Sequence, residues 1–174
     1  RRKLEAEAVR DAVLSVSGAL NLQMEGPSFR DFVVEKPEHS PHYEYRLHDP
    51  ADPASHRRSI YRFTVRSQQQ PFMTTLDCAD PSMSVGRRNE SASPLQALTL
   101  LNNGLMLEMS KRFGARLEGV PGGLAAQVRE ACFSALGRAP TREEESTLTS
   151  YAREHGLTNL CRVVFNLNEF SFVD

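Results

Sequence analysis

The stretch VGRRNESASPLQALTLLNN, residues 85–103, decides the fold that we expect, because it joins a helix start to a long apolar helix. Ser93 and Gln96 have the spacing of a capping box, in which each residue bonds the backbone of the other. Pro94 takes the first helical position, where the missing N–H of proline costs nothing. Leucine then occurs on nearly every side of the helix, so we expect this helix to be central and buried.

The end of this apolar run is marked by Asn102, Asn103 and Gly104. A buried amide without hydrogen-bond partners costs about 1–3 kcal/mol. We therefore expect Asn102 to lie near the middle of the helix and to bond a neighbouring loop. A ligand-binding Asn102 and a helix that breaks at Asn103-Gly104 are the alternatives.

Further helix boundaries follow along the second half of the chain. A helix is predicted to start after Gly122-Gly123 and to end at Gly137, three residues before Pro140. Thr141 and Glu144 then form a second capping box. We expect that helix to end at His155-Gly156 and one more to follow it.

The first half combines one amphipathic helix with short strands. Apolar residues recur every four positions over residues 4–16, and Gly18 suits the end of that helix. Residues 21–53 are rich in proline and contain strand candidates at 32–34 and 43–47. The clearest strand pattern covers residues 58–67, and these strands predict a small antiparallel sheet with one wet face.

We therefore predict a fold of the α+β class that is mostly α: a bundle of about five helices with a small antiparallel sheet. The 174 residues suit a single domain, with a helix and loop-rich sheet portion over residues 1–92 and a helical portion over 93–174. Because the chain starts with Arg1 rather than Met, we expect it to be an excised or processed piece of a larger protein.

Composition excludes several classes of function. Hydrophobic residues make up 40% and charged residues 25%, which is typical of a soluble globular protein. A formal net charge of −1 provides no overall field for nucleic acid, and no apolar run approaches the ~20 residues of a membrane span. The haem-attachment motif C-x-x-C-H is absent, so this piece carries no covalent haem c.

Arginines are the strongest functional lead. In the predicted strand over 58–67, Arg58, Arg62 and Arg66 share one face. Such a row of guanidinium groups suits a sulfated or carboxylated glycan. The alternative is that these arginines pair with Glu44 and other acidic residues on the same face of the sheet.

A second cationic group precedes the capped helix. Arg87, Arg88 and Asn89 lie just ahead of a helix N-terminus, whose free N–H groups favour anions. We expect either an external anion or an acidic side chain of the same chain at this position. Asn102 completes the set of ligand-binding candidates.

Histidines gather in the loop-rich region, together with Glu44 and two aspartates. Imidazole and carboxylate groups together suit a transition metal, but the spacing matches no metal motif, so we favour a surface loop. A histidine that activates Ser40 or Ser55 is a further alternative. The histidines concerned are His39, His42, His48 and His56.

The three cysteines, Cys78, Cys132 and Cys161, form no zinc motif and no disulfide framework, although a single disulfide stays open. Asp77 and Asp80 flank Cys78, and carboxylates do not favour a reactive thiolate. We expect the two aspartates to bond backbone amides in a turn. Cys132 and Cys161 lie in apolar helical contexts that favour burial.

Five blocks of the chain together resemble one known family. They are RRSIYRF (57–63), PFMTTLDCADPS (71–82), RRNESASPLQALTLLNN (87–103), ALGRAPTREEE (135–145) and GLTNLCRVVFNLNEFSFVD (156–174). The chain resembles the planctomycete-specific domain of unknown function found at the C-terminal end of large cytochrome-c-associated proteins. The resemblance implies an extracytoplasmic bacterial protein, with haem c only in upstream domains, and it implies no catalytic residues.

Two hypotheses of function follow. The favoured one is a non-catalytic binding or docking module within a cytochrome-c-linked polypeptide, whose partners are the upstream domains and an acidic or sulfated glycan. The alternative is a part of an enzyme for polysaccharide or redox chemistry that upstream domains complete. The sequence alone leaves open whether the protein is an enzyme, and it predicts no nucleic acid partner.

Overall fold

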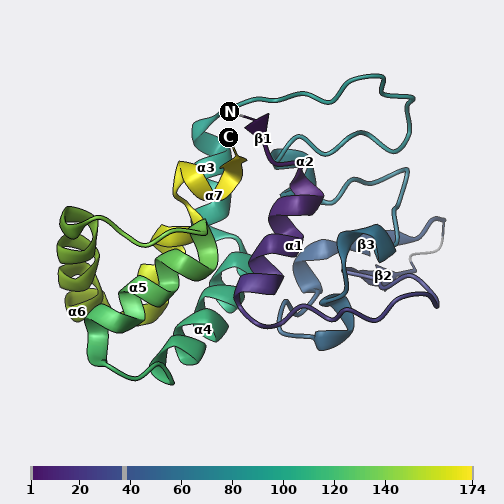
Figure 1. Ribbon diagram of the computed structural model, residues 1–174. Coiled ribbons are helices and arrows are strands. Elements are labelled where there is room, and N and C mark those ends of the chain that lie inside the picture. The colour runs from purple at the N-terminus through teal and green to yellow at the C-terminus, as the bar shows by residue number, and fades with distance from the viewer. Residues whose placement is uncertain (1, 37–38, 174) are drawn as a thin grey trace.

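The computed structural model describes residues 2–36 and 39–173, and it is mostly helical (Figure 1). Its helices are α1 (Ala6–Val16), α2 (Pro71–Thr75), α3 (Pro94–Asn102), α4 (Gly104–Glu118), α5 (Gly123–Leu136), α6 (Arg142–Phe165) and α7 (Asn168–Ser171). The strands are β1 (Arg2–Lys3), β2 (Val33–Glu35), β3 (His42–Glu44) and β4 (Phe172–Val173). The predicted class, mostly α with a small antiparallel sheet, is confirmed.

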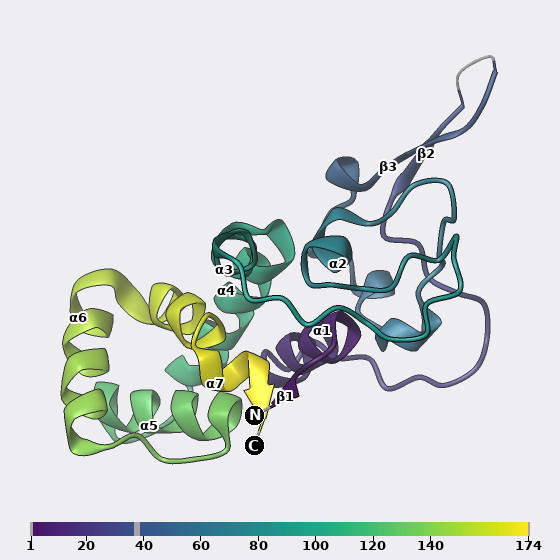
Figure 2. The same cartoon turned by 90° about the horizontal axis from the view of Figure 1, so that it is seen from above.

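Four short strands form two separate antiparallel pairs. β1 pairs with β4, which places the two ends of the chain side by side (Figure 2). β2 pairs with β3 in a hairpin that projects from the body of the molecule (Figure 2). Three 3-10 turns, η1 (Tyr45–Leu47), η2 (Pro53–Ser55) and η3 (Ser59–Tyr61), follow this hairpin along the chain.

The hydrophobic core lies where α4, α5 and α6 pack together, with α1 and α7 against them (Figure 1). Phe113 of α4 stacks on Phe165 of α6 with ring centroids 5.6 Å apart. Gly114 allows the two helices to approach closely, because a Cβ atom there would lie 3.1 Å from the backbone nitrogen of Thr158. This helical group is the scaffold on which the rest of the chain rests.

Several predicted helix boundaries are confirmed. Gly137 adopts the left-handed conformation at the end of α5, and Thr141 and Glu144 form a complete capping box at the start of α6. Gly156 has φ 81° and ψ 163°, so it interrupts α6 at the predicted place. Ser93 accepts a hydrogen bond from the Gln96 backbone at 3.3 Å, which confirms the cap of α3.

The prediction that the helix after Ser93 is central and buried is wrong. Leu95 and Leu98 are 62% and 56% exposed, and the helix that buries its apolar face is α4 instead, where Met106, Met109, Phe113 and Leu117 are fully buried. The apolar run is split because the Asn103 side chain accepts from the Leu105 backbone at 3.0 Å and so starts a new helix. Asn102 is consequently exposed at the end of α3, where it accepts a hydrogen bond from Arg162 at 3.3 Å.

The strand predicted over residues 58–67 is also wrong. Ser59 begins the 3-10 turn η3, and both its backbone N–H and its hydroxyl donate to Asp11 of α1 at 2.7 Å. These two bonds hold the chain against α1 as a turn, and only one isolated bridge, between Phe29 and Arg62, resembles strand pairing. Arg58, Arg62 and Arg66 therefore share no strand face.

No helix in the described part of the chain has the length and apolar character that a bilayer crossing requires. This finding agrees with the predicted lack of a membrane span.

Candidate functional site

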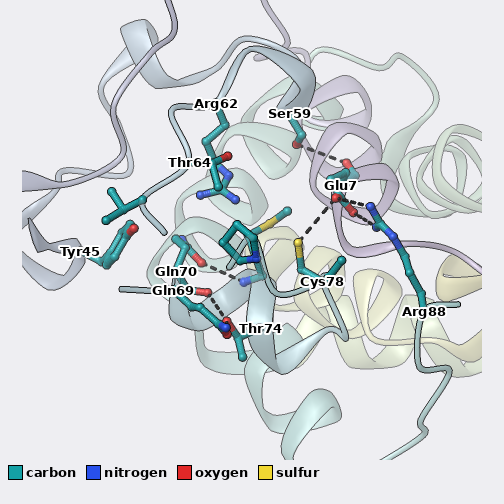
Figure 3. Close-up of a pocket in the computed structure, with 14 residues that line it drawn as sticks. Glu7, Tyr45, Ser59, Arg62, Thr64, Gln69, Gln70, Thr74, Cys78 and Arg88 are labelled. Carbon is teal, nitrogen blue, oxygen red and sulfur yellow. Dashed lines mark hydrogen bonds and ion pairs between the residues drawn. The ribbon is translucent and has the colours of Figure 1, made fainter. Parts of the chain in front are cut away.

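A cavity of about 150 Å³ opens between α1, the segment after η3, and α2 (Figure 3). Polar side chains make up most of its labelled wall, and Figure 3 shows the Arg62 side chain extending into it. The wall includes Glu7, Tyr45, Arg62, Gln70, Cys78 and Arg88. Four separate regions of the sequence, at residue 7, at residue 45, over 59–81 and at residue 88, therefore meet at this site.

The Glu7 carboxylate on the cavity wall is already neutralised. Arg88 donates two hydrogen bonds to Glu7, at 2.6 and 3.0 Å, and lies 3.5 Å from Glu5. Burial alone would raise the pKa of Glu7, but the bonds from Arg88 outweigh it and hold that pKa below its ordinary value. The pair ties the loop before α3 to α1, so Arg88 has a structural partner.

The Arg62 guanidinium group, in contrast, makes no hydrogen bond and no ion pair with residues 2–36 and 39–173, and only the Arg62 backbone is bonded, to the Ser59 carbonyl. Glu7 contributes one negative charge to the cavity wall, while Arg62 and Arg88 contribute one positive charge each. Within the wall itself, Arg62 is therefore the positive charge that no wall carboxylate neutralises, while the buried Asp31 carboxyl outside this wall interacts with it electrostatically. The cavity is therefore suited to an anionic group.

Uncharged hydrogen-bonding groups lie beside Arg62. Gln70 caps α2 through its Oε1 atom, which accepts from the Met73 backbone at 2.8 Å. This bond fixes the Gln70 side chain and leaves its Nε2 without a partner in the described residues. Tyr45 brings an aromatic ring to the same wall, and burial raises the pKa of its hydroxyl.

Cys78 is a protonated thiol rather than a nucleophile. Its Sγ atom donates to Glu7 at 3.5 Å. Burial raises the pKa of the Cys78 thiol, and the Glu7 charge raises it further. The sequence-based prediction that Cys78 is unreactive agrees with this environment. No histidine lines the cavity among the described residues, so these residues offer no imidazole base there.

The other arginines of the predicted binding set lie elsewhere. Arg58 is 3.9 Å from Asp11 and mostly exposed, and Arg66 is exposed on the loop that leads to α2. Arg87 and Asn89 are exposed on the loop before α3. The structure thus brings Arg62 and Arg88 to one cavity and leaves the remaining candidates on the open surface, where their role in binding stays a prediction.

The start of α3 is occupied by an acidic side chain of the same chain. The Asp77 carboxylate accepts from the Ser91 backbone and from Lys3, both at 2.8 Å, and from Gln96 at 3.1 Å. These bonds lower the pKa of Asp77 to about 2, although burial opposes them. The carboxylate that pairs with the predicted group at residues 87–89 is Glu7, through Arg88, and an external anion at this group stays a prediction.

The four candidate histidines do not converge. His39 and His42 are exposed, His56 is buried with Nε2 2.9 Å from the Pro50 carbonyl, and His48 lines a different cavity. Among residues 2–36 and 39–173, no group of three or more His, Cys, Asp or Glu residues is placed to hold a metal ion. All three cysteines are free thiols.

Sequence reasoning missed Glu7, Tyr45 and Gln70. Glu7 is one of several charged residues on the polar side of its helix, and Gln70 stands in a run of three glutamines. Neither has a local pattern that separates it from a solvated side chain. Only the fold brings them beside Arg62.

The fold and the cavity define a class: a mostly helical domain with one small polar, cationic recess and no evident catalytic pair in it. The comparisons add the family. The chain belongs to the family PSD1, described as a protein of unknown function (DUF1553), which matches residues 1–152 and so includes every residue of the cavity wall. No curated protein and no solved structure matches the chain.

Proposed function

We propose that this domain is a non-catalytic binding module, and that the Arg62 cavity holds the acidic group of a glycan. The observation that carries the proposal is the unpaired Arg62 guanidinium in a recess whose carboxylate is already paired with Arg88. A guanidinium group binds a carboxylate or sulfate through two parallel hydrogen bonds. Gln70 Nε2 offers a further donor to the same group.

A binding role fits the chemistry of the cavity better than catalysis. The Cys78 thiol is held protonated, and the Glu7 carboxylate is paired and so is a poor general base. The volume of about 150 Å³ suits a carboxylate or sulfate with the adjoining part of a sugar ring. The rest of a polymer would lie over the surface.

The wider context of the proposal comes from the resemblance of the chain. We propose an extracytoplasmic bacterial protein of the planctomycete type, in which this domain follows cytochrome-c-associated upstream domains. Those domains would carry haem c and would be docking partners of this one. The exposed arginines at 58, 66 and 87 would then provide weaker, solvent-screened contacts to an acidic polymer.

Calorimetric titration with galacturonic acid and a sulfated monosaccharide tests the proposal. Arg62→Ala should weaken binding at least about tenfold, because a charge-assisted hydrogen bond contributes about 1.5–3 kcal/mol. Arg66→Ala is the matched control, since it removes an equal charge from the nearby exposed loop, and it should change affinity less than about twofold. Equal losses in both variants, or no binding by the wild type, would contradict the proposal.

A further inference from the structure

A second cavity, of about 400 Å³, adjoins the first. Tyr45 and Gln70 line both cavities, so these two side chains form the wall between them. The far side of the second cavity is built from α2 and from the junction of α3 and α4, where Phe72 and Leu105 lie. The second cavity thus combines apolar faces with the polar side chains of Asp31 and His48.

Two polar atoms at this cavity have unused hydrogen-bonding capacity. Asp31 Oδ1 and His48 Nε2 are buried and have no hydrogen-bond partner in the described residues. Asp31 is only 7% exposed, so bulk water does not compensate for the missing bonds. A buried polar atom without a partner costs about 1–3 kcal/mol, and such atoms are rare in folded proteins.

The charges of two arginines, Arg62 and Arg10, act on the Asp31 carboxyl. Burial raises the pKa of the Asp31 carboxyl, and the positive charges of Arg62 and Arg10 offset this only in part. Arg10 is already committed, because it donates to the Arg57 carbonyl at 3.0 Å and to Ser59 at 3.3 Å. Asp31 therefore lacks a direct partner although cations lie near it.

We propose that the second cavity takes a neutral, hydroxylated sugar ring that adjoins the acidic residue held by Arg62. This inference rests on the proposed function, since the two cavities would hold neighbouring units of one saccharide. Ring hydroxyl groups donate to Asp31 Oδ1 and bond to His48 Nε2. The C–H face of the sugar packs on Tyr45 and Leu105, as an amphipathic ring does on apolar side chains.

Saccharides of two lengths separate the two sites. The probes are galacturonic acid, a disaccharide of galacturonic acid and a neutral hexose, and the neutral hexose alone. For the wild type we expect the acidic disaccharide to bind at least tenfold more tightly than galacturonic acid. Asp31→Asn, which keeps the side-chain volume, should reduce the disaccharide affinity to that of galacturonic acid without weakening the binding of galacturonic acid itself.

Arg62→Ala distinguishes failure of this inference from failure of the proposed function. It should weaken binding of galacturonic acid at least about tenfold while weak binding of the neutral hexose, still sensitive to Asp31→Asn, remains. If galacturonic acid binds through Arg62 but the disaccharide gains nothing, the second site is refuted and the proposed function stands. If only the neutral hexose binds, and Asp31→Asn removes it, the proposed function fails and the second cavity alone is a sugar site. His48→Gln should repeat the effect of Asp31→Asn, so unchanged disaccharide binding in both variants overturns the inference.

Discussion

Replacing Asp77 with Asn should remove a specific, pH-dependent part of the stability of the fold. The Asp77 carboxylate joins three distant segments, because it accepts from Lys3 in β1, from Ser91 before α3 and from Gln96 within α3. The side chains of Lys3 and Asp77 are only 8% and 16% exposed. Asp77 has φ 66°, a left-handed conformation that asparagine adopts readily, so Asp77→Asn adds no backbone strain.

The magnitude follows from the pKa of Asp77. A pKa lowered from 3.8 to about 2 corresponds to about 2.5 kcal/mol at most, at about 1.4 kcal/mol per unit. Solvent reaches the network at the exposed Ser91, so we expect a loss of about 1–2 kcal/mol at pH 7. Because the pKa is depressed in the folded state, this stability is present above about pH 4 and is lost as the pH falls towards 2.

Urea denaturation of the wild type and Asp77→Asn at several pH values measures this difference. The gap of about 1–2 kcal/mol at pH 7 should shrink as the pH falls from 4 to 2. Asp80→Asn is the control, because the Asp80 carboxylate bonds Ser82 in its own turn and Gln69 before α2, and so does not join β1 to α3. A gap that does not depend on pH, or an Asp80→Asn variant that loses as much, would refute the reasoning.

Four further variants test the fold and the sites. Leu98→Ala should lower the free energy of unfolding by less than about 0.5 kcal/mol, because Leu98 is 56% exposed. Leu117→Ala in the buried face of α4 should lower it by about 2–5 kcal/mol. Equal losses in denaturant melts would support a central position of α3 instead. Gly114→Ala should lower the midpoint of thermal unfolding, because the new Cβ atom would lie 3.1 Å from the Thr158 backbone nitrogen. This crowding should outweigh the higher helix propensity of alanine. A raised midpoint would show that α4 and α6 separate easily at this contact. Asp31→Asn should be more stable than the wild type at pH 7, because burial raises the pKa of the Asp31 carboxyl and its ionisation therefore opposes folding. This gain in stability should vanish below the pKa that Asp31 has in the unfolded chain. A loss of stability at pH 7 in urea melts would contradict this prediction.

The sequence located helix boundaries well because their chemistry is local. Ser93, Gly137, Thr141 and Gly156 each act on backbone groups within a few residues, so spacing alone reveals them. Burial is not local. The leucines of α3 have the pattern of a buried helix, but Asn103 starts a new helix and the core forms around α4 instead.

In the candidate site, too, the tertiary fold rather than local sequence decides which residues come together. Arg62 was predicted as part of a cationic strand face, yet it lies in the cavity because the bonds between Ser59 and Asp11 turn the chain against α1. Its neighbours Glu7 and Gln70 come from segments that only the tertiary fold brings together. No sequence motif marks Asp31, because the lack of a hydrogen-bond partner at its Oδ1 atom is a property of the folded chain.

The most direct test of the central claim is a nuclear magnetic resonance titration of the labelled protein with galacturonic acid. We expect the largest shift changes at the Arg62 side-chain Nε–H and at the backbone amides of Thr64 and Gln70, with little change at the exposed Arg66 and Arg87. Changes of similar size at all exposed arginines, or none at Arg62, would contradict the claim that this cavity is the anion-binding site.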